Sequence, residues 1–335
     1  MAPQSLEQIA QNLVTPGKGI LAADESNGTM SKRLEAVNVE PSEHTRRAYR
    51  SAMFSSKGIE EYISGVILFD ETIRQKMDDG IPIPDYLVSR GIIPGIKVDT
   101  GAKPLSFHEG ETVTEGLDGL RGRCEEYHSM GARFAKWRAV IKIHGDLPSR
   151  AAISVNAHAL ARYAAICQEQ RIVPIIEPEV LMSGSHGLEQ CGLITSRILD
   201  AVYSECKIQG VNLAGTILKP NMILPGSEAG KVDGHSVARA TAEVLKTKVP
   251  EEVAGVAFLS GGQSDFDATS HLNETNLTME NAPWPLTFSF GRALLADALT
   301  LWSKSEIKAA QSKLLHRSRM NALASKGAWS PDLEV

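Results

Sequence analysis

The sequence lacks several features that would assign it to a common class of protein. Only four cysteines occur in 335 residues, at positions 124, 167, 191 and 206, and none belongs to a CxxC pair. Scattered thiols argue against a disulfide framework or a zinc knuckle and are typical of a reducing compartment. The net charge is −5, so no basic surplus indicates nucleic acid or an anionic membrane as a partner.

Apolar runs long enough to span a bilayer are also absent. Residues 1–19 carry apolar side chains at helical spacing before Pro16-Gly17, with no basic start and no long apolar core. This stretch is predicted to be a first helix rather than a signal peptide. We therefore expect a cytoplasmic protein that does not bind membranes.

Metal-binding motifs are missing as well. The nine histidines form no HxH pair and no HExxH. Glu177 and Glu179 would suit a divalent ion, but the cations Lys136 and Lys219, expected nearby, would repel it. We expect no metal and no other cofactor.

What the sequence does contain is a series of short apolar runs separated by helical, charged stretches. The runs span residues 19–25, 63–70, 92–99, 132–138, 172–179, 215–225, 256–262 and 286–292. Strands alternating with helices at intervals of roughly 30–45 residues favour a closed (β/α)8 barrel, whose usual length is about 250 residues plus insertions. A doubly wound open sheet is the alternative, weakened because no GxGxxG follows the first run.

We predict one α/β domain over residues 1–335, a TIM barrel with an N-terminal helix and a short, loosely held C-terminal tail. Helices are predicted over residues 42–54, 151–170, 188–208, 236–246 and 305–320. The polar stretch 273–283 is predicted to be a loop with a short helix.

One charge stands in the middle of an apolar run. Residues 215–225 read GTILKPNMILP, and Lys219 is the only charged residue among them. A buried ammonium group is costly unless it is paired or used, and burial favours the neutral amine, a nucleophile toward carbonyls. Taken alone, the run also fits an edge strand whose lysine reaches water along its aliphatic stem.

The runs share a second pattern, because they begin apolar and end polar or charged. The late residues are Asp24, Lys97, Asp99, Lys136, Arg138, Glu177, Glu179, Lys219, Ser260 and Arg292. In a barrel these strand ends meet at the C-terminal mouth, where active sites are built. A single such charge is explained by a strand leaving into solvent, but acids and bases alternating around one rim predict a site that binds anions and moves protons.

Glycines and cations after three of the runs predict phosphate sites. Ser260, Gly261 and Gly262 follow the seventh run, and Gly291 and Arg292 follow the eighth, which is the habitual phosphate site of this fold. A second anion site is predicted after the first run, from Ser26, Gly28, Lys32 and Arg33. Lys32 and Arg33 also fit a solvated helix start. Two phosphate sites flanking a nucleophilic lysine suggest a bisphosphorylated sugar.

Eight motifs, in order, resemble class I fructose-1,6-bisphosphate aldolase. They are AADES at 22–26, GVILF at 65–69, GIKVD at 95–99, FAKWR at 134–138, VPIIEPE at 173–179, LKPN at 218–221, FLSGGQ at 258–263 and FSFGRA at 288–293. The match runs from about Gly17 to the region of Trp302. It implies a (β/α)8 homotetramer that cleaves fructose 1,6-bisphosphate reversibly to dihydroxyacetone phosphate and glyceraldehyde 3-phosphate, in glycolysis or gluconeogenesis.

The resemblance also implies residue roles. Lys219 is similar to the family's Schiff-base lysine, Glu177 to its general acid/base for carbinolamine dehydration, and Asp24 to the carboxylate that assists proton transfer at the C4 hydroxyl. Lys136 resembles the cation beside the nucleophile, and is expected to disfavour a second charge there. Ser260, Gly261, Gly291 and Arg292 resemble the 1-phosphate site. Ser26, Lys32, Arg33 and Lys97 resemble residues toward the 6-phosphate, with Arg138 and Glu179 nearby.

Two departures from the family pattern stand out. Thr29 replaces a serine common in the family, and the chain ends in WSPDLEV, whereas many members end in a tyrosine that helps to protonate the enamine. The resemblance therefore leaves that proton step, and the preference for a bisphosphate over a monophosphate, unassigned. Two other interpretations stay open: another lysine-dependent sugar-phosphate lyase or transaldolase, and a catalytically idle scaffold that binds proteins.

Overall fold

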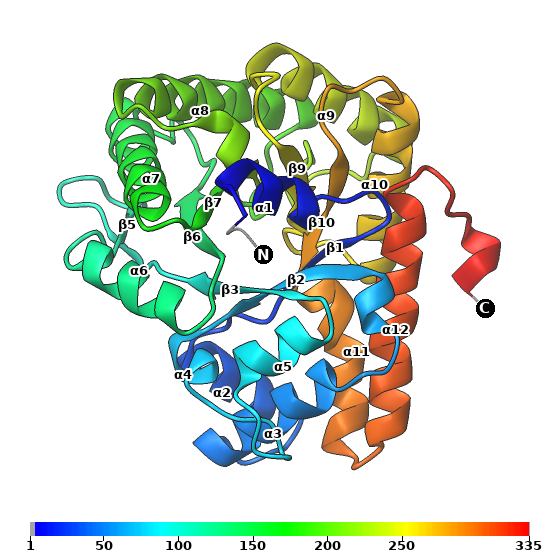
Figure 1. The fold of residues 1–335 in the computed structure, drawn as a ribbon. Helices are drawn as coiled ribbons and strands as arrows, with labels where there is room; N and C mark the ends of the chain where they lie inside the picture. Colours follow the sequence, from blue (N-terminus) through cyan, green and yellow to red (C-terminus); the bar gives the residue numbers. More distant parts are fainter. Residues whose placement is uncertain (1–3, 335) are drawn as a thin grey trace.

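The computed structural model describes residues 4–334 and shows a closed, all-parallel barrel of eight strands (Figure 1). The barrel strands are β1 Gly19–Ala22, β2 Ile63–Leu68, β3 Ile93–Lys97, β6 Phe134–Ile141, β7 Val173–Val180, β8 Ile217–Leu218, β9 Gly255–Phe258 and β10 Leu286–Phe290. Because β1 pairs with both β2 and β10, the sheet has no edge. The predicted (β/α)8 barrel is confirmed, and the open-sheet alternative is wrong.

Helices surround the barrel (Figure 1). They are α1 Leu6–Leu13, α2 Asn27–Ala36, α3 Glu43–Phe54, α4 Asp70–Ile73, α5 Ile83–Ser89, α6 Leu120–Ser129, α7 Arg150–Glu169, α8 Leu188–Ile208, α9 Gly234–Lys248, α10 Asp265–Thr278, α11 Arg292–Ser303 and α12 Ile307–Ala324, with 3₁₀ turns η1 Ile59–Glu61, η2 Leu213–Gly215 and η3 Pro331–Glu334. The five helices predicted between residues 42 and 320 are confirmed. None of the helices in the described part of the chain is long and apolar enough to cross a membrane.

The polar stretch 273–283, predicted to be a loop with a short helix, does contain both: α10 runs through it to Thr278, and the residues beyond are not helical. The helix is longer than predicted, because it begins at Asp265. Ser264 caps the helix, and its buried residues Ala268, Leu272 and Thr275 recur every three or four positions. The buried side of α10 includes two threonines and an asparagine, which is why composition alone indicated only a short helix.

The first helix closes one end of the barrel. In Figure 1, α1 lies across the end that faces the viewer. Its Leu13 and Val14 pack so closely on the strand starts that a Cβ at Gly65 would come within 2.6 Å of Leu13, and one at Gly255 within 2.7 Å of Val14. The carbonyl of Leu13 also accepts a hydrogen bond from Ser64 Oγ, at 2.6 Å. The interior of the barrel is therefore filled with apolar side chains at this end.

Alternation along the long strands sends charges inward at the mouth. On β6, Ala135 and Trp137 belong to the apolar layer between the strands and the helices, while Phe134 packs inside the barrel with α1. Since strand residues two apart share a face, Lys136 and Arg138 follow Phe134 on the inner side. The outer positions therefore build the core, and the inner positions build the site.

A short antiparallel hairpin beside the mouth was not predicted. Its strands are β4 Gly101–Pro104 and β5 Thr112–Glu115. Thr114 Oγ1 donates to the carbonyl of Arg138 at 2.7 Å, so the hairpin lies against the end of β6. β4 is mostly exposed and β5 is half-buried, but Thr112, Thr114 and Glu115 of β5 are polar, so the hairpin lacks an apolar signal.

The C-terminal segment is held firmly, and the prediction of a loosely held tail is wrong. Trp329 is 7% exposed, packs edge-on against Phe266, and donates its Nε1–H to Glu334 at 3.0 Å. Glu334 also pairs with the buried Arg317 of α12. One aromatic anchor and one buried cation thus fix a segment whose composition looks like surface chain.

Candidate active site

The open mouth of the barrel holds a cavity of about 1220 Å³. Its lining includes the predicted site residues Asp24, Ser26, Arg33, Lys97, Lys136, Arg138, Glu177, Glu179, Lys219, Ser260, Gly261, Gly291 and Arg292. They come from the C-terminal ends of seven of the barrel strands, all but β2, and the loops that follow them. The predicted convergence of strand ends is therefore what the fold produces.

Three predicted residues stand outside this lining: Lys32, Gly262 and Gly28, which is exposed near the start of α2. Lys32 is exposed on α2, whose inward side is formed by Met30 and Leu34, so it fits the solvated helix start better than an anion site. Gly262 is exposed beside the cavity, and a Cβ built on it would lie 3.8 Å from the Arg292 guanidinium.

Lys219 follows the shortest strand of the barrel. The run 215–225 was predicted to be a strand, but β8 spans only Ile217–Leu218. Lys219 N–H still donates to Ile176 O at 2.8 Å, and regular pairing then stops at Pro220, which has no N–H. The strand lies between β7 and β9, and the Lys219 side chain is only 4% exposed, so the edge-strand interpretation is wrong.

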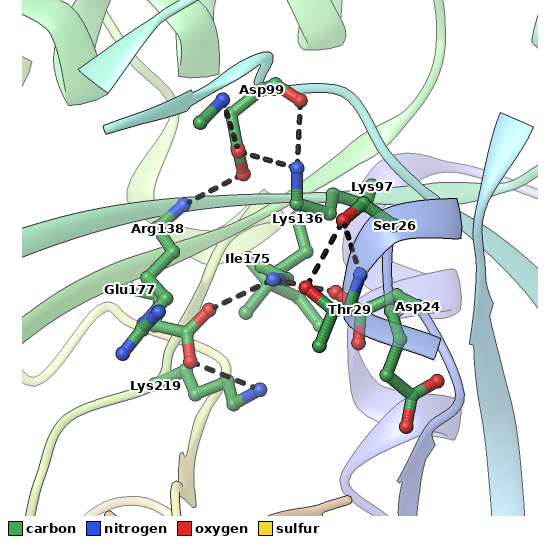
Figure 2. A network of polar contacts seen from close by, with 12 residues as sticks. Asp24, Ser26, Thr29, Lys97, Asp99, Lys136, Arg138, Ile175, Glu177 and Lys219 are labelled. Atoms are coloured by element: carbon green, nitrogen blue, oxygen red, sulfur yellow. Dashed lines mark hydrogen bonds and ion pairs between the residues drawn. The ribbon is translucent and has the colours of Figure 1, made fainter. Parts of the chain in front are cut away.

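Four charged side chains form a continuous chain across the mouth (Figure 2). Lys136 Nζ lies 2.6 Å from Asp24 Oδ2 and 3.3 Å from Glu177 Oε2, and the other oxygen of Glu177 lies 3.1 Å from Lys219 Nζ. The order is therefore Asp24, Lys136, Glu177, Lys219, with charges alternating. Lys136 is balanced by two carboxylates, and one carboxylate separates it from Lys219.

The lysines keep both acids ionised. Burial opposes ionisation of Asp24, but the charges of Lys136 and Lys219 outweigh it and lower its pKa to about 2. Burial likewise opposes ionisation of Glu177, and the same two lysines with Arg138 hold its pKa below the usual value. Burial also opposes the Lys136 ammonium, yet Asp24 and Glu177 raise its pKa.

These shifts make the site a contributor to stability at neutral pH. For Asp24 the folded-state pKa, about 2, lies below its ordinary value of 3.8. Ionised Asp24 therefore adds to the free energy of unfolding at a pH above its ordinary pKa, and this stabilisation is lost as the pH falls through the folded-state pKa.

Further out, three cations at the rim are each held by a carboxylate. Lys97 Nζ lies 2.6 Å from Asp99 Oδ1, Arg138 pairs with Glu179, and Arg33 pairs with Glu25. Asp99 also accepts the backbone N–H groups of Gly101 and Arg138. Asp99 was predicted to lie at the rim but was given no role, and Glu25 was not singled out. Their sequence signal was present, since each is an acid at a strand end, but only the fold shows what each one orients.

Arg292 differs from those cations. It is exposed at the first position of α11, and among residues 4–334 it has no ion-pair partner. Gly291 precedes it as the N-cap, and the loop opposite contains Gly261 and Gly262 with φ of 57° and 94°. A free guanidinium, a helix N-terminus and a glycine turn are features that anion sites in proteins share.

Ser26 occupies the start of a second helix at the mouth. As N-cap of α2 it accepts from Thr29 N–H at 3.4 Å, and its hydroxyl lies 3.1 Å from Thr29 Oγ1 (Figure 2).

Sequence reasoning also missed Ser289 of β10, a buried hydroxyl in the cavity lining that has no hydrogen-bond partner among the described residues. Its alternation with Phe288 and Phe290 was the available signal.

No metal centre is evident in the described range, 4–334, where no three His, Cys, Asp or Glu side chains are grouped to hold an ion. The acids of the mouth are engaged by lysines and arginines instead.

Comparisons with known proteins agree on one family. The family model for fructose-bisphosphate aldolase class-I matches residues 5–334. A Xanthomonas axonopodis pv. citri protein named "Probable fructose-bisphosphate aldolase class 1" is 50% identical over 98% of this chain and 99% of its own length. An Arabidopsis thaliana protein named fructose-bisphosphate aldolase 6, cytosolic, is 50% identical over 96% of this chain and 90% of its own.

A solved structure gives the same answer. The fructose-bisphosphate aldolase of Plasmodium falciparum, crystallised with TRAP and a small-molecule inhibitor, superposes with a TM-score of 0.95. It is 43% identical and covers 98% of each chain.

A closed parallel barrel with buried, alternating charges at its mouth defines a (β/α)8-barrel enzyme. Within that class, the chain belongs to the class-I fructose-bisphosphate aldolase family and is a lyase.

Proposed function

We propose that this chain cleaves fructose 1,6-bisphosphate reversibly to dihydroxyacetone phosphate and glyceraldehyde 3-phosphate through a Schiff base on Lys219. The observation that carries the proposal is the buried Lys219 ammonium with its nitrogen 3.1 Å from Glu177. A buried lysine beside an acid, at the mouth of a barrel, is the arrangement that imine chemistry requires.

The first step is attack of Lys219 on the C2 ketone of the open-chain sugar. Passing one proton from the ammonium to Glu177 leaves a neutral amine and a protonated acid, and the two atoms are already within hydrogen-bond distance. The amine adds to C2, and Glu177 then donates the proton that allows the carbinolamine hydroxyl to leave as water. Lys136, 3.3 Å from Glu177, stabilises the carboxylate form before and after each transfer.

The second step breaks the C3–C4 bond. Asp24, with its pKa lowered to about 2, is an ionised carboxylate at neutral pH and accepts the proton of the C4 hydroxyl, directly or through Lys136. The electron pair of the C3–C4 bond moves onto the iminium nitrogen, giving an enamine on Lys219 and releasing the aldehyde. Protonation and hydrolysis of the enamine then free dihydroxyacetone phosphate.

The two phosphates orient the sugar across this row of charges. We assign the 1-phosphate to Arg292, the start of α11 and the loop of Ser260 and Gly261, because Arg292 lines the cavity, is exposed and has no ion-pair partner among residues 4–334. We assign the 6-phosphate end to Ser26, Arg33 and Lys97, with the Arg138–Glu179 pair beside them. Lys32 is left out of this assignment because it is absent from the cavity lining.

The test is chemical trapping. Borohydride reduction with dihydroxyacetone phosphate is expected to fix the adduct on the peptide that contains Lys219, and cleavage of fructose 1,6-bisphosphate is expected to survive EDTA. An adduct on a different lysine, or loss of activity with the chelator, would remove the mechanism. Assaying the products separates this reaction from that of another lysine-dependent lyase or a transaldolase. The idle-scaffold alternative predicts no adduct at all.

We also propose that the chain forms a homotetramer in the cytoplasm, as its family resemblance implies. The plant relatives from Arabidopsis thaliana and Cicer arietinum are named cytosolic and cytoplasmic. Apolar side chains exposed on α8, Leu193 and Ile208, are suited to contact between subunits. The measurement is the sedimentation mass, expected at four times that of the 36.2-kDa chain.

A glycine at the predicted 1-phosphate site offers a steric test. A Cβ at Gly291 would lie 3.0 Å from the carbonyl oxygen of Ala22, so Gly291→Val is expected to force the ends of β1 and β10 apart. Displacing the start of α11 by even a fraction of an ångström should lower kcat/KM for the bisphosphate about tenfold or more, while borohydride still traps Lys219. Steady-state kinetics give the measurement.

The matched control is Gly187→Val. Gly187 is also the N-cap of a long helix, α8, but a Cβ there meets nothing within 4 Å. It is expected to leave kcat/KM within about twofold, since surface changes of this kind are usually small. Equal losses in both variants would mean that any β-branched residue at a helix start is harmful, and that the contact with Ala22 is irrelevant.

A further inference from the structure

A histidine outside the cavity lining is tied to the glycine turn at the predicted 1-phosphate site. His271 lies on α10, eight residues beyond Gln263, and its Nδ1 is 2.6 Å from Gln263 Oε1. The other end of the same amide, Nε2, donates to the carbonyl of Ser260 at 3.0 Å. Gln263 thus bridges the helix and the loop.

The Ser260 carbonyl determines which way the next N–H points. It accepts two hydrogen bonds from Gln263, one from the side chain and one from the backbone N–H at 3.0 Å. In a trans peptide the C=O and the following N–H point in opposite directions, so turning the carbonyl toward Gln263 turns Gly261 N–H away from it. Gly261 lines the cavity next to Ser260, with φ of 57°.

His271 in turn determines which end of the Gln263 amide faces Ser260. An amide can rotate by half a turn, and the wrong orientation would bring Oε1 against the Ser260 carbonyl oxygen. The N–H at His271 Nδ1 prevents this rotation of the Gln263 amide, because Oε1 can accept its proton and the amide nitrogen cannot. Burial lowers the pKa of His271, against the opposing charge of Asp267, and this favours a neutral ring. The contact with the acceptor Oε1 of Gln263 places the ring proton on Nδ1.

The helix gives His271 a firm base. A Cβ on Gly234, at the start of α9, would come within 3.4 Å of the His271 ring. The ring is therefore packed between α9 and α10 and has little freedom to leave Gln263.

We infer that His271 is a positioning residue that, through Gln263, aims the Gly261 N–H at the phosphate nearest Lys219. The inference rests on the proposed function for the identity of the substrate, but the anion-binding step needs no catalysis. If His271 acts in this way, the affinity for phosphate depends on a side chain of α10 that does not contact the substrate.

The experiment compares His271→Phe with His271→Asn. Phenylalanine retains the ring and its packing but cannot donate. Asparagine carries an N–H donor on the atom bonded to Cγ, the same position as His Nδ1, and should restore the hydrogen bond. Inorganic phosphate binding by calorimetry and steady-state kinetics on fructose 1,6-bisphosphate are measured for both, and thermal melts verify folding.

For His271→Phe we expect the phosphate Kd and the KM each to rise about three- to tenfold, the size of one net hydrogen bond, with kcat within about twofold. His271→Asn should return both toward the wild-type values. Unchanged Kd and KM in His271→Phe would overturn the inference, and so would an equal loss in His271→Asn. If the wild type fails to cleave the bisphosphate but the phosphate Kd responds as described, the proposed function falls and the positioning role of His271 stands.

Discussion

Replacing Lys219 by methionine is expected to lower kcat for cleavage by at least about 10⁴-fold and to abolish borohydride trapping, since no other group supplies the covalent electron sink. Methionine has nearly the same length, and its apolar side chain suits a position that is only 4% exposed. Glu177 keeps Lys136 as a partner at 3.3 Å, so no carboxylate is left unpaired. The variant should therefore fold, and the loss should be one of chemistry.

A matched control separates chemistry from loss of charge. Lys246 is an exposed lysine near the end of α9, and Lys246→Met is expected to retain full activity and the adduct. Residual trapping in Lys219→Met, with mass added at a different lysine, would show that the nucleophile had been assigned wrongly. Activity within tenfold of wild type would exclude the Schiff base altogether.

Replacing Glu177 by glutamine is expected to lower kcat about 10²- to 10⁴-fold, the usual range for loss of a positioned acid/base. The amide retains the shape of the side chain but cannot take the proton of Lys219 or return it to the carbinolamine. It also removes the anion that lies between Lys136 and Lys219. The rate of borohydride trapping should fall with kcat, because formation of the iminium, rather than the later cleavage, becomes slow.

Single-turnover trapping with dihydroxyacetone phosphate measures this directly. Glu169→Gln, at an exposed carboxylate on α7 that pairs only with Arg121 on the surface, is the control and should behave as wild type. If Glu177→Gln forms the iminium at the normal rate, then Glu177 serves a later step and its assignment here is incorrect. Because the pKa of Glu177 is lowered, the wild-type carboxylate is charged across the neutral range.

Sequence reasoning succeeded where a local pattern has a single physical solution. Alternate residues of a strand face the same side. Once residues 134–138 are taken as a strand with Phe134 facing the barrel interior, Lys136 and Arg138 must face the interior as well. Helix bounds were predicted in the same way: the helix predicted from residue 42 is α3, whose N-cap is Ser42, and the predicted bounds of α8 agree with those observed. In each case the signal lies within one or two turns of chain.

It failed where the decisive contact is distant in sequence. The tail was predicted to be loose because nothing near Trp329 shows that Phe266 and Asn273 will hold it. The Lys219 run was predicted to be a long strand because burial and strand pairing look alike in composition, whereas Pro220 ends the pairing and leaves the burial intact. Lys32 was predicted to bind an anion because it follows the first strand together with Arg33, but only Arg33 reaches the cavity.

By itself, then, the chain's amino-acid order determined the eight strands, the inward set of charges and the family. Only the tertiary structure decided which charge neutralises which. Asp24, Lys136, Glu177 and Lys219 come from four different strand ends, spread over nearly 200 residues, and their partners depend on ångström-scale placement. Electrostatic energy depends on the distances between charges and on their burial, and neither quantity exists until the barrel has closed.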